Sequence, residues 1–146
     1  MTPKSSTICV DANIAIRVVI DGPHQDMIRE QWCRWVSTDT QLIAPSLFSY
    51  EITNTIWKYV YAKELSTFDA EEVLNTLLNL GIQLERPLNL HVAALKLAQE
   101  FQQTNAYDVH YLALARQYGC EFWTMDQRLY NSVYNKLVWV KTFPRQ

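Results

Sequence analysis

The amino-acid sequence predicts an α/β fold, a three-layer α/β/α sandwich with a central, mainly parallel sheet of four to five short strands. Short β-rich runs alternate with helix-compatible segments along most of the chain, and two of those runs end in an aspartate. At 146 residues the chain has the usual length of one domain, and no linker-like stretch or repeat divides it. We therefore expect a single domain over residues 1–146.

Hydrophobic periodicity and turn residues place the elements in order. The expected strands cover residues 6–10, 41–44, 82–85, 121–124 and 136–140. The expected helices cover residues 12–17, 25–37, 46–62, a segment from a Ser66-x-x-Asp69 cap to a stop at Gly81, 88–103 and 106–118. The side chains expected to face inward from the helices are Ile28, Trp32, Trp35, Val36, Phe48, Ile52, Ile56, Tyr59, Phe68, Val73, Leu77, Leu78, Val92, Leu95, Leu97, Ala98 and Phe101.

Composition restricts the class of protein. The net charge of −2 leaves no overall basic footprint for nucleic acid, so any such contact must rest on a local patch. The apolar runs are too short to span a membrane, and no signal-peptide core is apparent, which predicts a soluble, cytoplasmic protein that does not contact a membrane. Cys9, Cys33 and Cys120 are widely spaced among apolar neighbours, which favours buried, reduced thiols.

Three aspartates stand at positions that a parallel sheet would bring together. Asp11 and Asp126 each follow a predicted strand, and Asp108 lies in the first turn of a predicted helix, on the face of Leu112 and Ala115. Each has an ordinary alternative: Asp11 and Asp126 as helix caps, Asp108 as a favourable charge at a helix N-terminus. Together they predict one site at the carboxyl edge of the sheet.

A cluster of carboxylates without cationic partners either takes up protons or recruits a cation. The ligands offered here are oxygens, and the three histidines lack the spacing of a zinc site, so the cluster favours Mg²⁺ or Mn²⁺. Such a site suits phosphoryl chemistry. Glu51 lies on the flank of an apolar helical stripe, and this pattern by itself favours a solvated border residue.

Four segments resemble the PIN domain nucleases, and among them the VapC-like toxins of prokaryotic toxin–antitoxin pairs. The segments are V-D-A-N-I at 10–14, S-Y-E-I-T-N-T-I-W-K at 49–58, Y-D-V-H-Y-L-A-L-A at 107–115 and F-W-T-M-D-Q-R-L at 122–129. The resemblance implies that Asp11, Glu51, Asp108 and Asp126 form an acidic quartet. It further implies that Asp11, Asp108 and Asp126 bind the metal, with Asn13 and Thr124 as polar supports.

The activity implied is metal-assisted hydrolysis of RNA phosphodiester bonds by an endoribonuclease, the toxin of a type II toxin–antitoxin pair. Either Glu51 or Asp126 would position or deprotonate the attacking water. The resemblance also implies an RNA substrate, a cognate antitoxin and a homodimer. Four basic residues flank the acidic elements and are candidates for phosphate contacts or plain surface charges: Arg17, Lys58, Arg116 and Arg128.

Other classes of function fit less well. An aspartyl-nucleophile phosphatase needs a second aspartate at position 13, which is Asn13, and a dinucleotide enzyme needs a glycine-rich turn after the first strand. A non-catalytic PIN-fold module that binds protein or RNA remains the alternative, because five Trp and eight Tyr provide aromatic surface for a partner.

Overall fold

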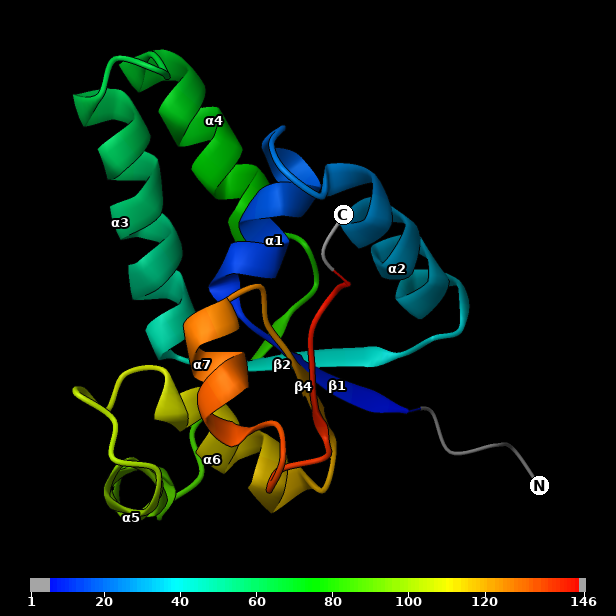
Figure 1. Cartoon of the computed structure of the whole chain (residues 1–146). Helices are drawn as coiled ribbons and strands as arrows, with labels where there is room; N and C mark the ends of the chain where they lie inside the picture. The colour runs from blue at the N-terminus through cyan, green and yellow to red at the C-terminus, as the bar shows by residue number, and fades with distance from the viewer. Residues whose placement is uncertain (1–5, 145–146) are drawn as a thin grey trace.

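The architecture is a five-stranded parallel sheet between helical layers, as the sequence predicts (Figure 1). The computed structural model describes residues 6–144; residues 1–5 and 145–146, the two ends of the expected domain 1–146, lie outside the described residues. The strands are β1 (Thr7–Val10), β2 (Gln41–Pro45), β3 (Gln83–Glu85), β4 (Glu121–Trp123) and β5 (Val140–Lys141). The helices are α1 (Ala12–Val19), α2 (Gln25–Ser37), α3 (Leu47–Tyr61), α4 (Thr67–Leu78), α5 (Leu90–Glu100), α6 (Val109–Tyr118) and α7 (Gln127–Val133).

The strand order places a topological switch at the centre of the sheet. The order is β3-β2-β1-β4-β5, so the chain builds outward from β1 on one side and then returns to add β4 and β5 on the other. β1 pairs with β4 through Ile8 and Glu121, Cys9 and Phe122, and Val10 and Trp123. In open parallel sheets, ligands bind beyond the carboxyl ends of the strands at such a switch. Asp11 and Asp126 follow these two central strands, so they lie at the same carboxyl edge of the sheet, as predicted.

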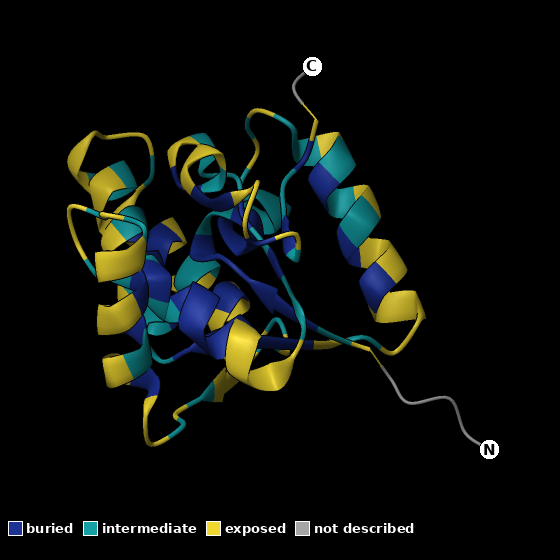
Figure 2. Ribbon diagram, turned by 60° about the horizontal axis from the view of Figure 1, so that its bottom comes forward, coloured by how far each residue is buried: buried dark blue, intermediate teal, exposed yellow. Residues whose placement is uncertain are grey.

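Helices cover both faces of the sheet. α1 and α2 lie on one face and α5 and α6 on the other, while the α3–α4 hairpin extends alongside α1 (Figure 1). The buried residues follow the strands and the inward sides of the helices (Figure 2). β1 contributes Cys9 and Val10, and α6 contributes Val109 and a continuous buried run from Tyr111 to Ala115. α6 is thus the central helix of its layer, which makes the position of its first residue important for the site.

α6 begins at Val109, not at residue 106 as predicted. The side-chain oxygen of Asn105 accepts a hydrogen bond from the backbone N–H of Tyr107 at 3.1 Å, and this local turn delays the helix. Asp108 therefore occupies the N-cap position instead of the first helical turn. At the far end, Gly119 adopts a left-handed conformation (φ 60°) that ends α6 where the sequence predicts.

The last strand also differs from its prediction. β5 starts at Val140 and pairs with β4 over only two residues, whereas the apolar pattern predicts a strand at 136–140. The preceding residues form a turn, in which the Leu137 N–H donates to the Val133 carbonyl at 2.8 Å. Leu137 is buried all the same. Its apolar character thus reflects burial at the end of α7 and not strand pairing.

The buried face of α5 is rotated from the predicted one. Leu90, Ala94 and Leu97 are buried against the core, at the spacing of one helical stripe, whereas Val92 and Leu95 are 57% and 56% exposed. The prediction for Val92 and Leu95 was wrong, because α6 contacts the other stripe of this helix. The remaining predicted inward residues divide into buried (Ile28, Trp32, Trp35, Phe48, Ile52, Ile56, Leu77), partly buried (Tyr59, Val73, Ala98, Phe101) and exposed (Val36, Phe68, Leu78).

Two further sequence expectations can be compared with the structure. All three cysteines are free thiols. Cys9 is buried as predicted and Cys120 is half-buried. Cys33 is exposed on α2, so the prediction that it is buried was wrong. Among the described residues, no helix has both the length and the apolar character needed to cross a membrane.

Candidate active site

The four predicted acidic residues line one cleft at the switch point of the sheet. Asp11 follows β1, Asp126 follows β4, Asp108 precedes α6, and Glu51 lies near the start of α3. The cleft has a volume of about 260 Å³ and is also lined by Asn13, Ile16, Arg17, Thr55 and Tyr59. We call it the acidic cleft and define it by its four carboxylates. Elements that are far apart along the chain meet here because β1 and β4 are adjacent.

Asp11 is the buried member of the cluster. Only 5% of the residue is exposed, and its carboxylate has lost most of its contact with water. The pKa of Asp11 is raised to about 8, first by burial and then by the negative charge of Glu51, with a smaller contribution from Asp108. A buried carboxyl group with raised pKa and two like charges nearby is held in an environment that favours a proton or a cation.

A hydrogen-bond network holds the Asp11 side chain in place. The fully buried Thr124 hydroxyl donates to Asp11 Oδ2 at 2.8 Å, and its oxygen accepts from the backbone N–H of Asp126 at 2.9 Å. Asn13 Nδ2 lies 3.4 Å from both Asp11 Oδ2 and Thr124 Oγ1, and Asn13 Oδ1 accepts from the Met125 N–H at 3.1 Å. These contacts connect the ends of β1 and β4 and orient the carboxylate.

Glu51 is held by a tyrosine from α6. The Tyr111 hydroxyl donates to Glu51 Oε1 at 2.8 Å. Burial raises the pKa of Glu51 and the charge of Asp108 adds to the rise, while this hydrogen bond opposes it by stabilising the carboxylate. The helical pattern favours a solvated border residue at this position, but the structure shows a half-buried carboxylate in the cleft with a fixed partner.

The capping explanation, which concerns Asp11 and Asp126, holds for Asp126 only. Asp126 Oδ1 accepts from the Leu129 N–H at 3.1 Å and so caps α7. Asp11 and Asp108 occupy the N-cap positions of α1 and α6 without a side-chain capping bond. The pKa of Asp108 is raised by burial and by the charge of Asp126. The Asp11 side chain therefore does not cap its helix, whereas the Asp108 carboxylate lies at the N-terminus of α6, where the helix dipole favours a negative charge.

The comparisons with known proteins agree with this geometry. The sequence profile described as the PIN domain matches residues 9–136, a range that contains all four acidic residues. The chain belongs to the PIN domain family. Members of this family are generally nucleases. The resemblance that the four sequence segments suggest is thereby confirmed.

Solved structures share the fold of this PIN domain. A chain in the crystal structure of VapBC2 from Rickettsia felis, bound to a DNA fragment from their promoter, superposes with a TM-score of 0.68 at 10% identity, covering 94% of this chain and 99% of that one. PAE2754 from Pyrobaculum aerophilum superposes with a TM-score of 0.62 at 19% identity, covering 90% and 83% of the two chains. No curated protein matches the sequence.

The ligands in the acidic cleft of the PIN domain suit a hard divalent cation. All four acidic side chains offer oxygen, and within residues 6–144 the only ion pairs are Arg29 with Asp21 and Arg34 with Glu30. In the same residues, no three His, Cys, Asp or Glu side chains converge closely enough to enclose an ion together. The charges of neighbouring carboxylates contribute to the raised pKa values of Asp11 and Asp108. Oxygen groups without a cationic partner are the kind of ligand that a hard divalent cation takes.

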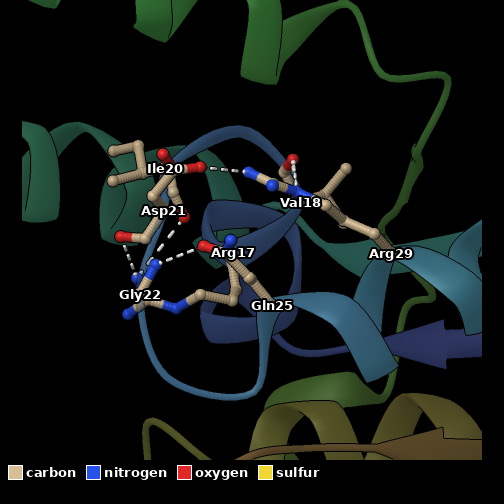
Figure 3. A network of polar contacts seen from close by, with 7 residues as sticks. All are labelled: Arg17, Val18, Ile20, Asp21, Gly22, Gln25 and Arg29. Carbon is tan, nitrogen blue, oxygen red and sulfur yellow. Dashed lines mark hydrogen bonds and ion pairs between the residues drawn. The ribbon is translucent and has the colours of Figure 1, made fainter.

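Of the four basic residues singled out in the sequence, Arg17 alone lines the cleft. Its Nη1 donates to the Asp21 carbonyl at 2.8 Å and lies 3.4 Å from the Ile20 carbonyl, which anchors the guanidinium at the loop after α1 (Figure 3). Gly22 leaves the space, because a Cβ there would lie 1.7 Å from Arg17 Nη1. The loop is held further by Arg29, which donates to Asp21 Oδ1 at 2.8 Å.

The other three basic residues are exposed and do not line the cleft. Arg116 lies near the C-terminal end of α6, where it lines a separate cavity with Gly119 and Glu121. Glu121 begins β4, so this cavity lies at the opposite edge of the sheet. Lys58 and Arg128 lie on α3 and α7. Arg17 is thus a lining residue of the cleft whose guanidinium is bonded at the loop after α1, whereas Arg116 lies at the far end of α6.

Tyr111 is the site residue that sequence reasoning missed. It falls in the apolar run of α6 and is fully buried, so it reads as a core residue. The available signal was chemical: a buried tyrosine hydroxyl normally needs a hydrogen-bond partner, and here the partner is Glu51. The spacing of the histidines in the sequence also gave no sign that the rings of His91 and His110 are in contact.

Proposed function

We propose that this PIN domain protein is a Mg²⁺- or Mn²⁺-dependent endoribonuclease that hydrolyses RNA phosphodiester bonds in the acidic cleft. The observation that carries the proposal is the buried Asp11 carboxyl group, which has a pKa of about 8 and shares the cleft with Glu51, Asp108 and Asp126. A fold gains nothing from holding four acids together unless a cation or a reaction requires them. The family supports nuclease chemistry.

Each side chain has a distinct part in the proposed reaction. Asp11, Asp108 and Asp126 would hold Mg²⁺ or Mn²⁺, which when bound neutralises charge on the phosphate and makes a coordinated water more acidic. Glu51, fixed by Tyr111, positions the attacking water and accepts its proton. Thr124 and Asn13 keep the Asp11 carboxylate oriented. Arg17 supplies a cation at the wall of the cleft for a backbone phosphate.

A cleavage assay tests the proposal directly. Purified protein is incubated with labelled single-stranded and structured RNA, and with DNA of the same sequences, in Mg²⁺, Mn²⁺ or EDTA. We expect cleavage of RNA in either metal and none in EDTA or with Asp11→Asn. Asp26→Asn is the matched control, because Asp26 is an exposed aspartate on α2. RNA binding without cleavage in any metal would favour a non-catalytic binding module.

Thermal unfolding locates the cation independently of cleavage. A cation that binds only the folded protein stabilises it by RT ln(1 + [L]/Kd), about 2.7 kcal/mol at a hundredfold excess over Kd. We expect Mn²⁺ to raise the melting temperature of the wild type and of Asp26→Asn, and to raise that of Asp108→Asn much less. Equal shifts in all three proteins would place the cation elsewhere.

We further propose that the protein is a cytoplasmic homodimer and the toxin of a type II pair, restrained by an antitoxin. Its fold is shared with a chain of VapBC2. The α3–α4 hairpin also presents three exposed aromatic side chains, Trp57, Tyr61 and Phe68. An amphipathic segment of an antitoxin could dock on them. A cavity on this hairpin is lined by Phe68, Asn75 and Leu80 among others.

Two measurements test the proposed assembly. Light scattering at tens of micromolar protein reports the dimer, and a monomer there would contradict it. Co-expression with the product of an adjacent gene reports the antitoxin. Phe68→Ser should reduce that co-purification, whereas Val138→Ser, at another exposed apolar residue, should not.

A further inference from the structure

A pair of histidines forms a directional hydrogen-bond chain beside the acidic cleft. His91 Nδ1 lies 3.0 Å from His110 Nε2, and His110 Nδ1 lies 2.6 Å from the Ala106 carbonyl oxygen. A carbonyl only accepts, so His110 Nδ1 carries a proton and, in the neutral ring, Nε2 is the acceptor. His91 Nδ1 then donates to it. In the neutral ring, His91 Nε2 then carries no proton. It is a hydrogen-bond acceptor that neither of these two contacts uses.

These histidines line a cavity of about 360 Å³, which we call the histidine pocket. It is lined by Leu47, Tyr50, Leu90, His91, Tyr107 and His110, among others. Its volume falls within the range of small-molecule sites, roughly 300–1,000 Å³. Tyr50 and Tyr107 are 70% and 66% exposed, so their rings are available to a ligand. The lining is mainly aromatic and aliphatic, with a few polar groups.

The histidine pocket and the acidic cleft both adjoin a third hollow. A shallow hollow between them is lined by Tyr50 and Tyr107, which also line the pocket, and by Glu51 and Asp108, which also belong to the cleft. Each tyrosine directly precedes one of these acids in the sequence. A polymeric ligand whose backbone lies in the acidic cleft can therefore place a neighbouring unit in the histidine pocket.

A cation is available at the rim of the pocket. Ser46, another lining residue, accepts a hydrogen bond from Arg86 Nε at 3.3 Å. Arg86 is exposed, and no ion pair holds it within the described residues. The pocket thus combines aromatic faces, a hydrogen-bond acceptor and a nearby guanidinium, which match a base, its polar edge and the adjoining phosphate.

We propose that the histidine pocket binds one unpaired nucleobase of the RNA next to the phosphodiester bond that is cut. This inference rests on the proposed function, because it assigns the substrate of the acidic cleft. The base stacks on Tyr50 or Tyr107, and His91 Nε2 accepts a hydrogen bond from an N–H group on the base edge. The pocket would thereby favour a base with an N–H donor and set a sequence preference at one position beside the cut.

Histidine-ring resonances test base binding without any cleavage. The chain contains three histidines, so histidine-labelled protein gives a simple spectrum, and His24 lies outside the pocket and serves as an internal reference. The four nucleoside 5′-monophosphates are added separately in EDTA, with ribose 5-phosphate as the control that lacks a base. We expect His91 and His110 to shift with at least one nucleotide and His24 to stay unchanged. Equal shifts with ribose 5-phosphate, or none with any nucleotide, would overturn the proposal.

Cleavage of a random-sequence RNA pool then tests the sequence preference. The cut ends of the wild type should show a biased base at one fixed position, and His91→Ala should weaken that bias at least threefold. Tyr107→Leu keeps an apolar side chain but removes the ring, and should slow cleavage of the preferred sequence roughly tenfold through weaker stacking. Tyr134→Leu, at an exposed tyrosine on another surface, is the control and should change neither property.

The outcomes separate the two proposals. If the wild type does not cleave RNA in any metal, the proposed nuclease function fails, and the histidine resonances still decide base binding. If the wild type cleaves and both pocket variants keep its bias and its rate, the histidine pocket is not a base site.

Discussion

The Tyr111 hydroxyl donates a hydrogen bond to Glu51 Oε1 at 2.8 Å, across 60 residues of sequence. Tyr111 belongs to α6 and Glu51 to α3, and the two helices begin beyond the same edge of the sheet. The ring of Tyr111 is fully buried against Phe122 of β4, with centroids 5.5 Å apart, so the hydroxyl is held rigidly by the core. The orientation of a carboxylate in the cleft is therefore coupled to the packing of the central helix.

Removing that hydroxyl should affect cleavage more than stability. Tyr111→Phe keeps the buried ring and loses one hydrogen bond to a carboxylate, so we expect the free energy of unfolding to fall by about 1–2 kcal/mol. The rate of RNA cleavage should fall at least tenfold while RNA affinity in EDTA stays within twofold. Tyr134→Phe is the control on an exposed tyrosine. An unchanged cleavage rate would show that Glu51 does not need this partner.

The raised pKa of Asp11 predicts a pH-dependent stability. Its ordinary pKa of 3.8 applies to the unfolded chain and the value of about 8 to the folded protein, so between these values the folded state binds the extra proton. The free energy of unfolding should then decrease as pH rises through this window, by up to ~1.4 kcal/mol per pH unit from this residue. Asp11→Asn removes the titration. Denaturant unfolding in EDTA at several pH values should show a flatter profile for this variant than for Asp26→Asn.

The Thr124 hydroxyl connects Asp11 with Asp126, so the stability of the protein should depend on this one group. Thr124→Val replaces the hydroxyl with a methyl group of similar size, leaving the Asp126 N–H without its acceptor and Asp11 without its donor. We expect a loss of ~1–3 kcal/mol in the free energy of unfolding and a further rise in the pKa of Asp11. Thr124→Ser keeps both contacts and should lose less than half as much. A Thr124→Val variant as stable as the wild type would show that the hydroxyl contacts do not stabilise the fold.

Arg17 and Arg116 form a matched pair for testing phosphate contacts. Arg17 lines the acidic cleft, whereas Arg116 lies near the other end of α6. In EDTA, Arg17→Ala should weaken RNA binding and reduce the slope of log K against log salt by about 0.7, the value for one phosphate contact on a single strand. Arg116→Ala should leave both unchanged. Gly22→Ala should weaken binding as well, because its Cβ would occupy the position of the Arg17 guanidinium.

Much of the fold could be predicted from local patterns. The Ser66 side chain accepts from the Asp69 N–H at 3.0 Å, as the cap motif indicates, and Gly119 ends α6 in the left-handed conformation. These features depend on residues within one helical turn of each other, so the sequence encodes them directly. The alternation of strands and helices likewise predicted the parallel sheet, and the pairing of β1 with β4 in that sheet places Asp11 and Asp126 at one edge.

Other features depend on which segments meet in space. Sequence periodicity showed an apolar stripe on α5 but not which stripe α6 would cover, so Val92 and Leu95 were placed on the wrong side. Asn105 delayed α6 through a turn that competes with the helix, and thereby moved Asp108 to the N-cap position. Such competition between local and helical hydrogen bonds is decided by small energy differences that a pattern does not contain.

The sequence by itself predicted the parallel α/β architecture, the grouping of Asp11, Asp108 and Asp126, and, through four motif segments, the family whose resemblance adds Glu51. Tertiary structure alone decided the partners of those acids: the buried Thr124 on Asp11, the core tyrosine on Glu51, and the contact of His91 with His110. The physical reason is the distance along the chain between the residues that determine each feature. Helix periods and caps arise from neighbours along the chain, whereas burial, pKa and long-range hydrogen bonds depend on side chains that only the packing of α3, α5 and α6 around the sheet brings together.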